Sequence, residues 1–409
     1  MNINSTRLLE KIQQLGEVGR DSEGKLSRLA YTNADRAGRD LVVHWMRELN
    51  LDIAIDAIGN IHGRWQTPAN AELATVMMGS HIDTVVNAGT LDGCYGVLAG
   101  LEVIASLQEA DIAPQRPIVV SVFANEEGAR FTPDMMGSLV YAGGLALHSA
   151  LDEVASDDGE RLGDALQRIG YAGTHQPGFL TPSAYLELHI EQGPILEHRG
   201  VAIGAVENLQ GISWQQISVQ GVANHAGTTP MSMRSDAGYV AAKVTTYVRE
   251  LALSCGNNMV ATVGTLQLTP DIINVVPSAA QFTVDLRAPD ETLLREAEAA
   301  LANFLSELAE HESVTIKTEK LARFEPVSFD QHLVRLIETV AASRQLSCQR
   351  MTSGAGHDAQ MLARICPAAM IFVPSEQGIS HNPREHTPAQ QLTDGANVLL
   401  DAVVSLMKL

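Results

Sequence analysis

Cysteine is scarce in this chain, which contains only four among its 409 residues. The four lie far apart and lack the paired spacing of a disulfide framework or of a cysteine-rich zinc site. They are Cys94, Cys255, Cys348 and Cys366. We therefore predict reduced thiols and a cytoplasmic protein.

The chain also lacks long apolar runs and an excess of basic residues. No run approaches the roughly 18–20 apolar residues that a membrane-spanning helix needs, and we expect no secretory leader, because no basic segment precedes an apolar stretch at the N-terminus. The 28 basic residues face 48 acidic ones, so the formal net charge is −20. Nucleic acid and anionic membrane surfaces are therefore unexpected partners, because both need a basic patch. A small anionic substrate remains compatible, since a pocket can be locally positive.

What the chain does contain is a repeated alternation of strands and helices. At this length we expect two domains rather than one core. Short apolar runs at residues 74–78, 118–123 and 185–189 indicate buried strands, and helical periodicity lies between the first two, at residues 94–108. Such alternation is typical of a largely parallel sheet covered by helices, in which sites lie at the strand ends.

The N-terminal segment carries weaker signals of the same kind. Ser5 or Thr6 is expected to cap a first helix, and a second helix is expected to begin near Thr32. Residues 51–61 alternate apolar and polar side chains, which predicts a strand.

The pattern changes at about residue 210. From there the expected order is strand, helix, strand, strand, helix, strand, the order of a ferredoxin-like fold. The expected elements are residues 214–221, 235–253, 259–268, 281–287, 291–310 and 314–321. Helices at 330–346 and 388–409 and a strand at 368–373 then resume the first architecture. We therefore predict an α/β domain of residues 1–209 and 326–409, with an inserted α+β domain at residues 210–325.

Imidazole and carboxylate side chains gather just past the predicted strands. His81 and Asp83 follow one strand, the pair Glu126 and Glu127 follows another, and Asp92 opens a helix. Two further histidines, His189 and His381, complete the set. Zinc takes imidazole nitrogen and carboxylate oxygen, and a hydrolytic site also needs one free carboxylate to accept a proton from water. The residues thus allow a metal-dependent hydrolase.

Each of these signals has a structural alternative. An isolated His-x-Asp is more often structural than catalytic, and Asp92 could be a helix cap beside the flexible Gly93. The acidic pair could be a solvated surface pair, and each histidine could be a loop residue with ordinary hydrogen bonds. Spacing by itself leaves these alternatives open.

Six segments, taken in order, strengthen the case. They are Gly-Ser-His-Ile-Asp-Thr at 79–84, Leu-Asp-Gly at 91–93, Asn-Glu-Glu-Gly-Ala-Arg-Phe at 125–131, Glu-Leu-His-Ile-Glu-Gln-Gly at 187–193, Asn-His-Ala-Gly-Thr-Thr-Pro-Met at 224–231 and Ser-Gly-Ala-Gly-His-Asp at 353–358. Together they resemble the di-zinc aminoacylase/carboxypeptidase superfamily, and within it the hydantoinase/carbamoylase branch. The resemblance covers essentially the whole chain. It implies a helix-covered mixed sheet as catalytic domain, with an inserted ferredoxin-like α+β domain that serves as lid and dimerisation domain.

The resemblance implies two divalent metal ions per subunit. Asp92 would bridge them, with His81 and His189 on one ion and Glu127 and His381 on the other. Zinc is the first expectation, and manganese, cobalt or nickel also suit such nitrogen and oxygen ligands.

The resemblance also implies roles in the reaction. Glu126 would be the general base, and Asp83 would hydrogen-bond the far nitrogen of His81. His225 would reach the active site of the partner subunit in a homodimer and stabilise the oxyanion.

The expected substrate is a small ureido compound that carries a carboxylate. Asn274 and Arg287 match the family's carboxylate clamp, and Gln192 and His357 are expected near the ureido group. Arg287 could instead be an ordinary charge at a strand end. Trp214 stands where similar allantoate enzymes place an arginine, which favours a carbamoyl amino acid with an apolar side chain.

We therefore predict hydrolysis of an N-carbamoyl-L-amino acid to the amino acid, carbon dioxide and ammonia. Allantoate hydrolysis is the main alternative, because residues 85–87 and 354–357 are shared with allantoate enzymes. β-Ureidopropionase activity is a further alternative. A dipeptidase or deacylase, or a scaffold protein that has lost catalysis, fits the retained residues less well.

Overall fold

The computed structural model describes residues 1–256 and 259–408. The chain divides into two compact units, one formed by Met1–Glu207 with Ser328–Leu409 and the other by Asn208–Val327. None of the helices in the described part of the chain is long and apolar enough to cross a membrane.

A mixed sheet forms the centre of the first unit. Its middle is parallel and consists of β4 (Ile118–Phe123), β3 (Thr75–His81), β5 (Pro182–Ile190) and β15 (Ala368–Val373), in that spatial order. Antiparallel strands β2 (Ile61–Trp65) and β1 (Asp52–Ile55) extend it beyond β4, and antiparallel β6 (Ile203–Leu209) extends it beyond β15. Strands β13 (Val327–Ser328) and β14 (Cys348–Ser353) both pair with β6. The four parallel strands are almost entirely buried, as the apolar runs predict.

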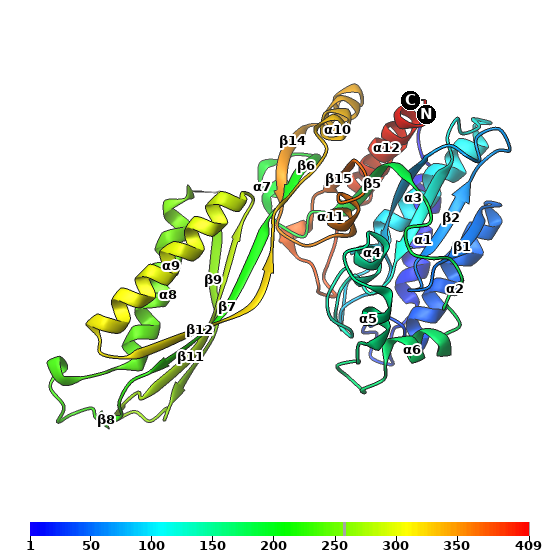
Figure 1. Ribbon diagram of the computed structural model, residues 1–409. Helices are drawn as coiled ribbons and strands as arrows, with labels where there is room; N and C mark the ends of the chain where they lie inside the picture. Colours follow the sequence, from blue (N-terminus) through cyan, green and yellow to red (C-terminus); the bar gives the residue numbers. More distant parts are fainter. Residues whose placement is uncertain (257–258, 409) are drawn as a thin grey trace. The chain divides into compact units, whose positions relative to one another are not determined.

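Helices cover this sheet. The longer ones are α1 (Ser5–Glu17), α2 (Asn33–Glu48), α3 (Cys94–Glu109), α10 (Gln331–Ser343) and α12 (Ala389–Leu406). The shorter ones are α4 (Met136–Tyr141), α5 (Leu147–Asp152), α6 (Leu162–Arg168), α7 (Ile195–Arg199) and α11 (Asp358–Leu362). Helix α3 packs on β3 and is itself flanked by α1 and α12 (Figure 1). It is therefore buried on all sides up to Leu107, and its Gly96 comes so close to β5 that an added Cβ would lie 2.4 Å from the Leu188 carbonyl oxygen.

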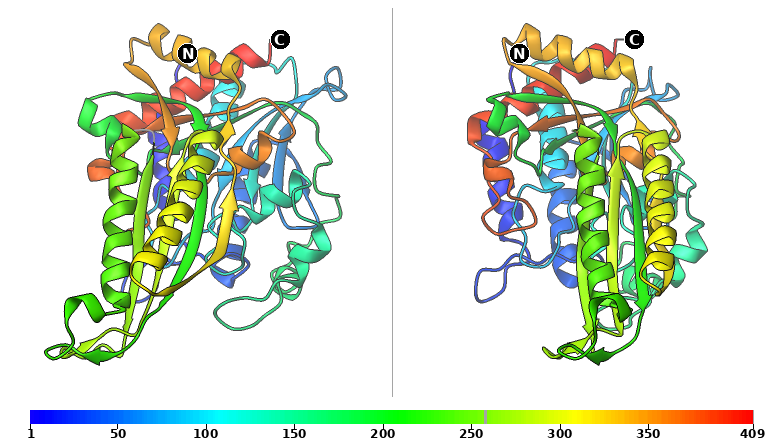
Figure 2. Two further views of the ribbon diagram at one scale, coloured as in Figure 1. Left: turned by 60° about the vertical axis from the view of Figure 1, so that its left-hand side comes forward. Right: turned by 90° about the vertical axis from the view of Figure 1, so that its left-hand side faces the viewer.

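The second unit has the predicted ferredoxin-like order. Its elements are β7 (Gly211–Gln220), α8 (Ala237–Ser254), β9 (Val260–Thr269), β11 (Ala279–Ala288), α9 (Glu291–His311) and β12 (Thr315–Phe324). The strands form an antiparallel sheet in the order β12-β7-β11-β9, and Figure 2 shows α8 and α9 along one face of it. Alternate residues of β11, such as Phe282 and Val284, are buried against these helices. The predicted fold class, an α/β sheet domain with an inserted α+β domain, is confirmed.

Three local expectations were wrong or incomplete. The first helix is capped by Asn4, whose side chain accepts a hydrogen bond from the Arg7 amide, and not by Ser5 or Thr6. The strand expected at 51–61 ends at Ile55, and β2 begins only at Ile61. Between them the Asp56 carboxylate accepts hydrogen bonds from the backbone amides of residues 58 and 60 and closes a turn. Strands β6, β13 and β14 were not predicted from the sequence; β13 has only two residues, and β14 (Cys-Gln-Arg-Met-Thr-Ser) contains few apolar side chains. The last residue of the helix expected at 388–409 lies outside the described residues.

Candidate metal centre

The predicted metal-binding residues lie at one edge of the central sheet. His81 is the last residue of β3 and His189 is the last but one of β5, while Glu126 and Glu127 follow β4 closely. Because parallel strands present their carboxyl ends at the same edge, these side chains meet although the chain separates them widely. Asp92 stands directly before α3. His381 lies on the loop between β15 and α12.

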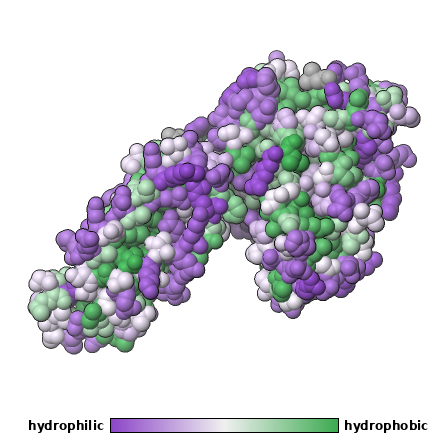
Figure 3. Space-filling model, viewed as in Figure 1, coloured by the Kyte–Doolittle hydropathy of each residue, from purple (hydrophilic) through white to green (hydrophobic). Residues whose placement is uncertain are grey.

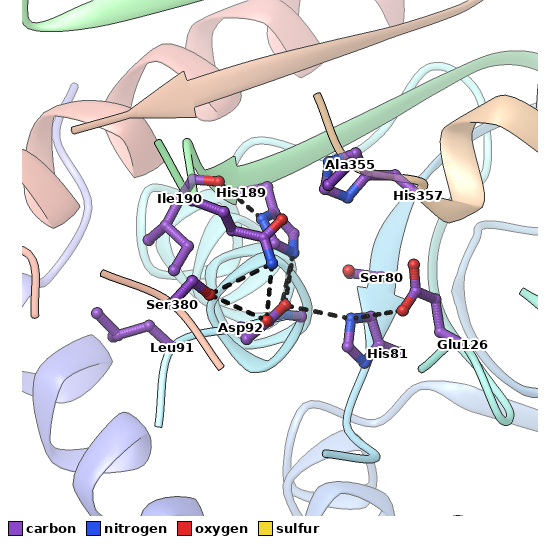
Figure 4. A network of polar contacts seen from close by, with 12 residues as sticks. Ser80, His81, Leu91, Asp92, Glu126, His189, Ile190, Ala355, His357 and Ser380 are labelled. Atoms are coloured by element: carbon purple, nitrogen blue, oxygen red, sulfur yellow. Dashed lines mark hydrogen bonds and ion pairs between the residues drawn. The ribbon is translucent and has the colours of Figure 1, made fainter. Parts of the chain in front are cut away.

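Asp92 is at the centre of this arrangement, and each of its carboxylate oxygens faces a different group. Figure 4 shows Asp92 with His81 and His189. Its Oδ1 lies 3.2 Å from Nε2 of His189 and 3.6 Å from Nε2 of His81. Its Oδ2 lies 3.1 Å from Nε2 of His381, and that same nitrogen lies 3.3 Å from Oε2 of Glu127. The Asp92 side chain therefore does not cap α3; it joins a group of His81 and His189 to a group of Glu127 and His381.

Two of the histidines are held in one orientation by main-chain carbonyls. Nδ1 of His81 lies 2.9 Å from the Asp83 carbonyl oxygen, and Nδ1 of His189 lies 2.8 Å from the Ile190 carbonyl oxygen. A carbonyl oxygen can only accept, so each Nδ1 carries a proton, and in the neutral ring each Nε2 keeps its lone pair. In agreement with this, Nε2 of His189 accepts a hydrogen bond from the Gly93 amide at 3.1 Å.

The role expected of the Asp83 carboxylate needs correction. Its Oδ1 is 3.9 Å from Nδ1 of His81, and the Asp83 carbonyl makes the closer contact. The two carboxylate oxygens instead accept hydrogen bonds from the amides of Glu126 and Glu127, each at 3.3 Å. Asp83 thus orients His81 with its main chain and the acidic pair with its side chain.

Glu126 belongs to neither group around Asp92, although it lies beside them. Its Oε2 is 3.4 Å from Nε2 of His81, and its side chain is only 9% exposed. Burial raises the pKa of Glu126 well above its usual range, and the nearby His81 opposes this shift. Glu126 also lines a cavity of about 120 Å³, together with Asp92, Glu127, Asp134, Gln192, Ala355, Gly356, His357 and His381. The acidic pair is therefore not a solvated surface pair.

The donor atoms fit divalent cations. Each of the two groups offers imidazole nitrogen and carboxylate oxygen with the ligand atoms within 4.8 Å of one another. Oε1 of Glu127 is buried and has no hydrogen-bond partner among the described residues, as expected of an atom that awaits a ligand. Burial raises the pKa of Glu127 to about 8, a cost that a neighbouring cation would offset.

A third group, formed by Glu187, His189 and His357, satisfies the same distance criterion. The Glu187 oxygens that could bind a metal already accept hydrogen bonds, from the Ser80 hydroxyl at 2.7 Å and from the Ala359 amide at 2.8 Å. Nε2 of His357 lies 3.1 Å from the Ser353 hydroxyl. We therefore interpret Glu187 and His357 as residues whose hydrogen bonds hold the ends of the strands in place, and not as cation ligands.

Gln192 and His357, which were expected near the ureido group, both line the cavity but have different neighbours. Gln192 donates through Nε2 to Oδ2 of Asp92 at 2.8 Å, so its amide contacts the Asp92 carboxylate. His357 is 1% exposed, and burial lowers its pKa well below the usual range, so the imidazole is neutral at physiological pH.

The remaining predicted site residues lie on the second unit, which is described here by itself. His225 is exposed on the short strand β8 (Asn224–His225), which pairs with β10 (Val275–Val276) beside the exposed Asn274. Trp214 on β7 and Arg287 on β11 are 6.0 Å apart, ring centroid to guanidinium carbon. The Arg287 guanidinium is paired with the Asp285 carboxylate at 2.9–3.1 Å.

Two residues that contact the centre were not expected from the sequence. The Ser380 hydroxyl lies 3.3 Å from Oδ2 of Asp92, and the Glu385 carboxylate accepts a hydrogen bond from the Asp92 amide at 3.2 Å. Ser380 precedes His381 directly, which is the only signal the sequence contains. Nothing in the local spacing of Glu385 indicates its contact with a residue almost three hundred positions earlier.

A protein-family model described as Peptidase family M20/M25/M40 matches residues 77–405. The chain belongs to this family. The N-carbamoyl-L-amino acid amidohydrolase of Geobacillus stearothermophilus is 37% identical to this chain over 99% of both chains. This chain is a hydrolase of amide C–N bonds. The allantoate amidohydrolase of Bacillus subtilis is 33% identical over 98% of this chain and 97% of its own. The crystal structure of an amidase of the hydantoinase/carbamoylase family from Burkholderia multivorans matches with a TM-score of 0.96 at 40% identity, over 99% of this chain and 98% of that one. The predicted family and branch are confirmed.

Proposed function

We propose that this protein hydrolyses the ureido C–N bond of N-carbamoyl-L-amino acids, releasing the amino acid, carbon dioxide and ammonia. The observation that carries the proposal is the geometry around Asp92, whose two oxygens face two separate donor groups while Glu126 stands beside them unassigned to either. Relatives named N-carbamoyl-L-amino acid amidohydrolases, at 34–37% identity over nearly the whole chain, support the substrate class.

His81 and His189 with Asp92, and Glu127 and His381 with the same Asp92, would hold two divalent cations. Such cations, with zinc as the first candidate and manganese, cobalt or nickel as others, polarise a carbonyl group and lower the pKa of water. Oε2 of Glu126 would accept the proton of the attacking water and later deliver it to the leaving nitrogen. The burial of Glu126 favours this role, because a carboxylate in a dry site is a stronger base than one in water.

His225 is suited to donate a hydrogen bond to the oxyanion of the reaction. Its Nδ1 accepts a hydrogen bond from the Gly227 amide at 3.0 Å, so the ring proton sits on Nε2. Arg234 holds the carbonyls of residues 226 and 229 and thereby steadies the loop that carries His225. We propose that the imidazole serves the partner subunit's site in a homodimer, with the unit Asn208–Val327 acting as lid and dimerisation domain.

Exposed apolar side chains flank His225 and suit a protein contact. Met231, Met233 and Ile273 are all more than two-thirds exposed, and Figure 3 shows pale and green atoms at the end of this unit that carries β8. Apolar residues that gather at an exposed tip lose water when they meet a second protein surface, which stabilises the association.

Arg287 and Asn274 would bind the substrate carboxylate. The planar guanidinium can hold a carboxylate with two parallel hydrogen bonds, and it now contacts the Asp285 carboxylate in this way. Trp214, exposed beside Arg287, would contact an apolar substrate side chain. Gln192 and His357 line the cavity and would contact the ureido group.

Allantoate hydrolysis is the second candidate, because two relatives at 33% and 35% identity carry the name allantoate amidohydrolase. Ammonia release from N-carbamoyl-L-methionine, N-carbamoyl-β-alanine and allantoate by the metal-loaded protein separates the candidates. We expect the first substrate to have the highest kcat/KM. Dominant turnover of allantoate or of N-carbamoyl-β-alanine would overturn the proposed substrate and assign the enzyme accordingly.

We also propose that the enzyme works in the cytoplasm. All four cysteines lie in the described part of the chain and are free, and Cys94 and Cys366 are buried. Free thiols are typical of a reducing compartment.

A further inference from the structure

Glu385 connects the two segments that bring Asp92 and His381 together. Its Oε1 accepts hydrogen bonds from the amides of Leu91 and Asp92, at 2.9 and 3.2 Å. Its Oε2 accepts a hydrogen bond from the Ser380 hydroxyl at 2.8 Å. One carboxylate, 8% exposed, thus holds the turn before α3 and the loop that carries His381.

The surroundings of Glu385 are built around its carboxylate. A Cβ atom added to Gly89 would lie 2.2 Å from Oε1 of Glu385, so a side chain at position 89 would displace the carboxylate. Ser380 in turn contacts Asp92 and Gln192: its Oγ lies 3.3 Å from Oδ2 of Asp92 and 3.3 Å from Nε2 of Gln192. The chain of contacts therefore ends on the oxygen of Asp92 that faces His381.

We infer that Glu385 is a positioning residue for the cation site, which sets the place of Asp92 through two backbone amides and the place of His381 through Ser380. The inference rests on the proposed function and extends it to a residue that touches neither substrate nor cation. A second buried carboxylate beside Asp92 is electrostatically costly, and divalent cations on the far side of Asp92 offset that cost.

Three variants of the full chain, Glu385→Ala, Glu385→Gln and Ser380→Ala, remove these hydrogen bonds to different extents. Zinc affinity is measured by competition with a chromophoric chelator, alongside kcat, KM and the rise in Tm on adding zinc. Loss of a hydrogen-bonding group behind a metal ligand weakens metal binding about 10–100-fold, and we expect Glu385→Ala in that range. Glu385→Gln keeps one oxygen for the two amides, and Ser380→Ala keeps both amide contacts. Both should lose less affinity than Glu385→Ala, and KM should change less than kcat in all three.

Glu102→Gln is the matched control. The Glu102 carboxylate is fully buried on α3 and accepts hydrogen bonds from the Asn4 amide, the Arg7 guanidinium and the Ser106 hydroxyl, away from Asp92. This variant should lower Tm equally with and without zinc and leave zinc affinity unchanged.

Unchanged zinc affinity in Glu385→Ala, or a fall in Tm that is equal with and without zinc, would overturn the inference and leave Glu385 a structural residue. If Glu385→Ala does not fold, the two milder variants decide in the same way. If the wild-type protein binds no divalent cation, the proposed function itself is wrong. This result differs from the one that would overturn only the role of Glu385.

Discussion

Nε2 of His81 lies 3.4 Å from Oε2 of Glu126, and the same nitrogen lies 3.6 Å from Oδ1 of Asp92. The His81 imidazole thus faces both the Asp92 carboxylate, which lies between the two groups of candidate ligands, and the Glu126 carboxylate, which belongs to neither group. If His81 binds a cation as proposed, Glu126 lies close enough to accept a proton from water bound to that cation, which is the geometry that general base catalysis needs. The amides of Glu126 and Glu127 donate hydrogen bonds to the Asp83 carboxylate, so the position of Glu126 is set by the segment that directly follows β3 and His81.

Glu126→Gln should retain cation binding and lose turnover. The amide keeps the shape of the side chain and cannot accept the proton of water, so kcat should fall by about 10²–10⁴. Zinc content after gel filtration and steady-state kinetics measure the two properties. Turnover near the wild-type rate would remove Glu126 from the proton-transfer role.

His225→Ala should lower kcat by about 10²–10³, because a donor to the oxyanion is lost, while zinc content and subunit association stay as in the wild type. Mixing tests whether the imidazole acts across the interface. Subunits with Glu126→Gln and subunits with His225→Ala, each inactive, should regain about a quarter of wild-type activity after statistical exchange in a dimer. No recovery in a mixture that demonstrably forms heterodimers would place His225 in its own subunit's site.

Arg287→Lys should raise KM about tenfold with little change in kcat, because lysine cannot hold a carboxylate through two parallel hydrogen bonds. Asp285→Asn is the matched control: it removes the present partner of Arg287 and should not raise KM. An Arg287→Lys enzyme with unchanged KM would show that the carboxylate is bound elsewhere.

Gly93→Ala should abolish cation binding at the centre. Gly93 has a φ of 62°, and a Cβ there would lie 2.4 Å from the imidazole ring of His81. Gly143→Ala, at a φ of 75° with nothing within 4 Å of the added Cβ among the described residues, pays only the backbone cost of about 1 kcal/mol. The two variants are compared by zinc titration and by Tm. Equal zinc binding in both would contradict the crowded position assigned to Gly93.

Removal of cations with a chelator should abolish activity and lower Tm, since a ligand that binds only the folded state stabilises it by mass action. Readdition of zinc, manganese, cobalt or nickel should restore activity to different extents, and the cation that restores the highest kcat/KM identifies the preferred one. Activity that survives exhaustive chelation, with cation content checked by atomic absorption, would argue against a metal-dependent hydrolase.

The sequence predicted the fold where side-chain burial is periodic and failed where it is not. The apolar run at 118–123 predicted β4 within a few residues, because a fully buried strand needs apolar side chains on both faces. In the second unit the strands bury alternate side chains, and that alternation predicted β11. The turn at Asp56 and the cap at Asn4 depend on single hydrogen bonds of polar side chains, which several neighbouring residues could have made equally well.

By itself, the sequence determined which residue types stand at the ends of the central strands, and hence that His81, Asp92 and Glu127 could share a cation site. Which atom of each residue acts was decided only by the tertiary structure. The carbonyl of Asp83, rather than its carboxylate, orients His81, and Gln192 donates to Asp92. Glu385 meets Leu91 across 294 positions of sequence. Contacts over such separations arise when the sheet and its helices pack, and local spacing carries no record of them.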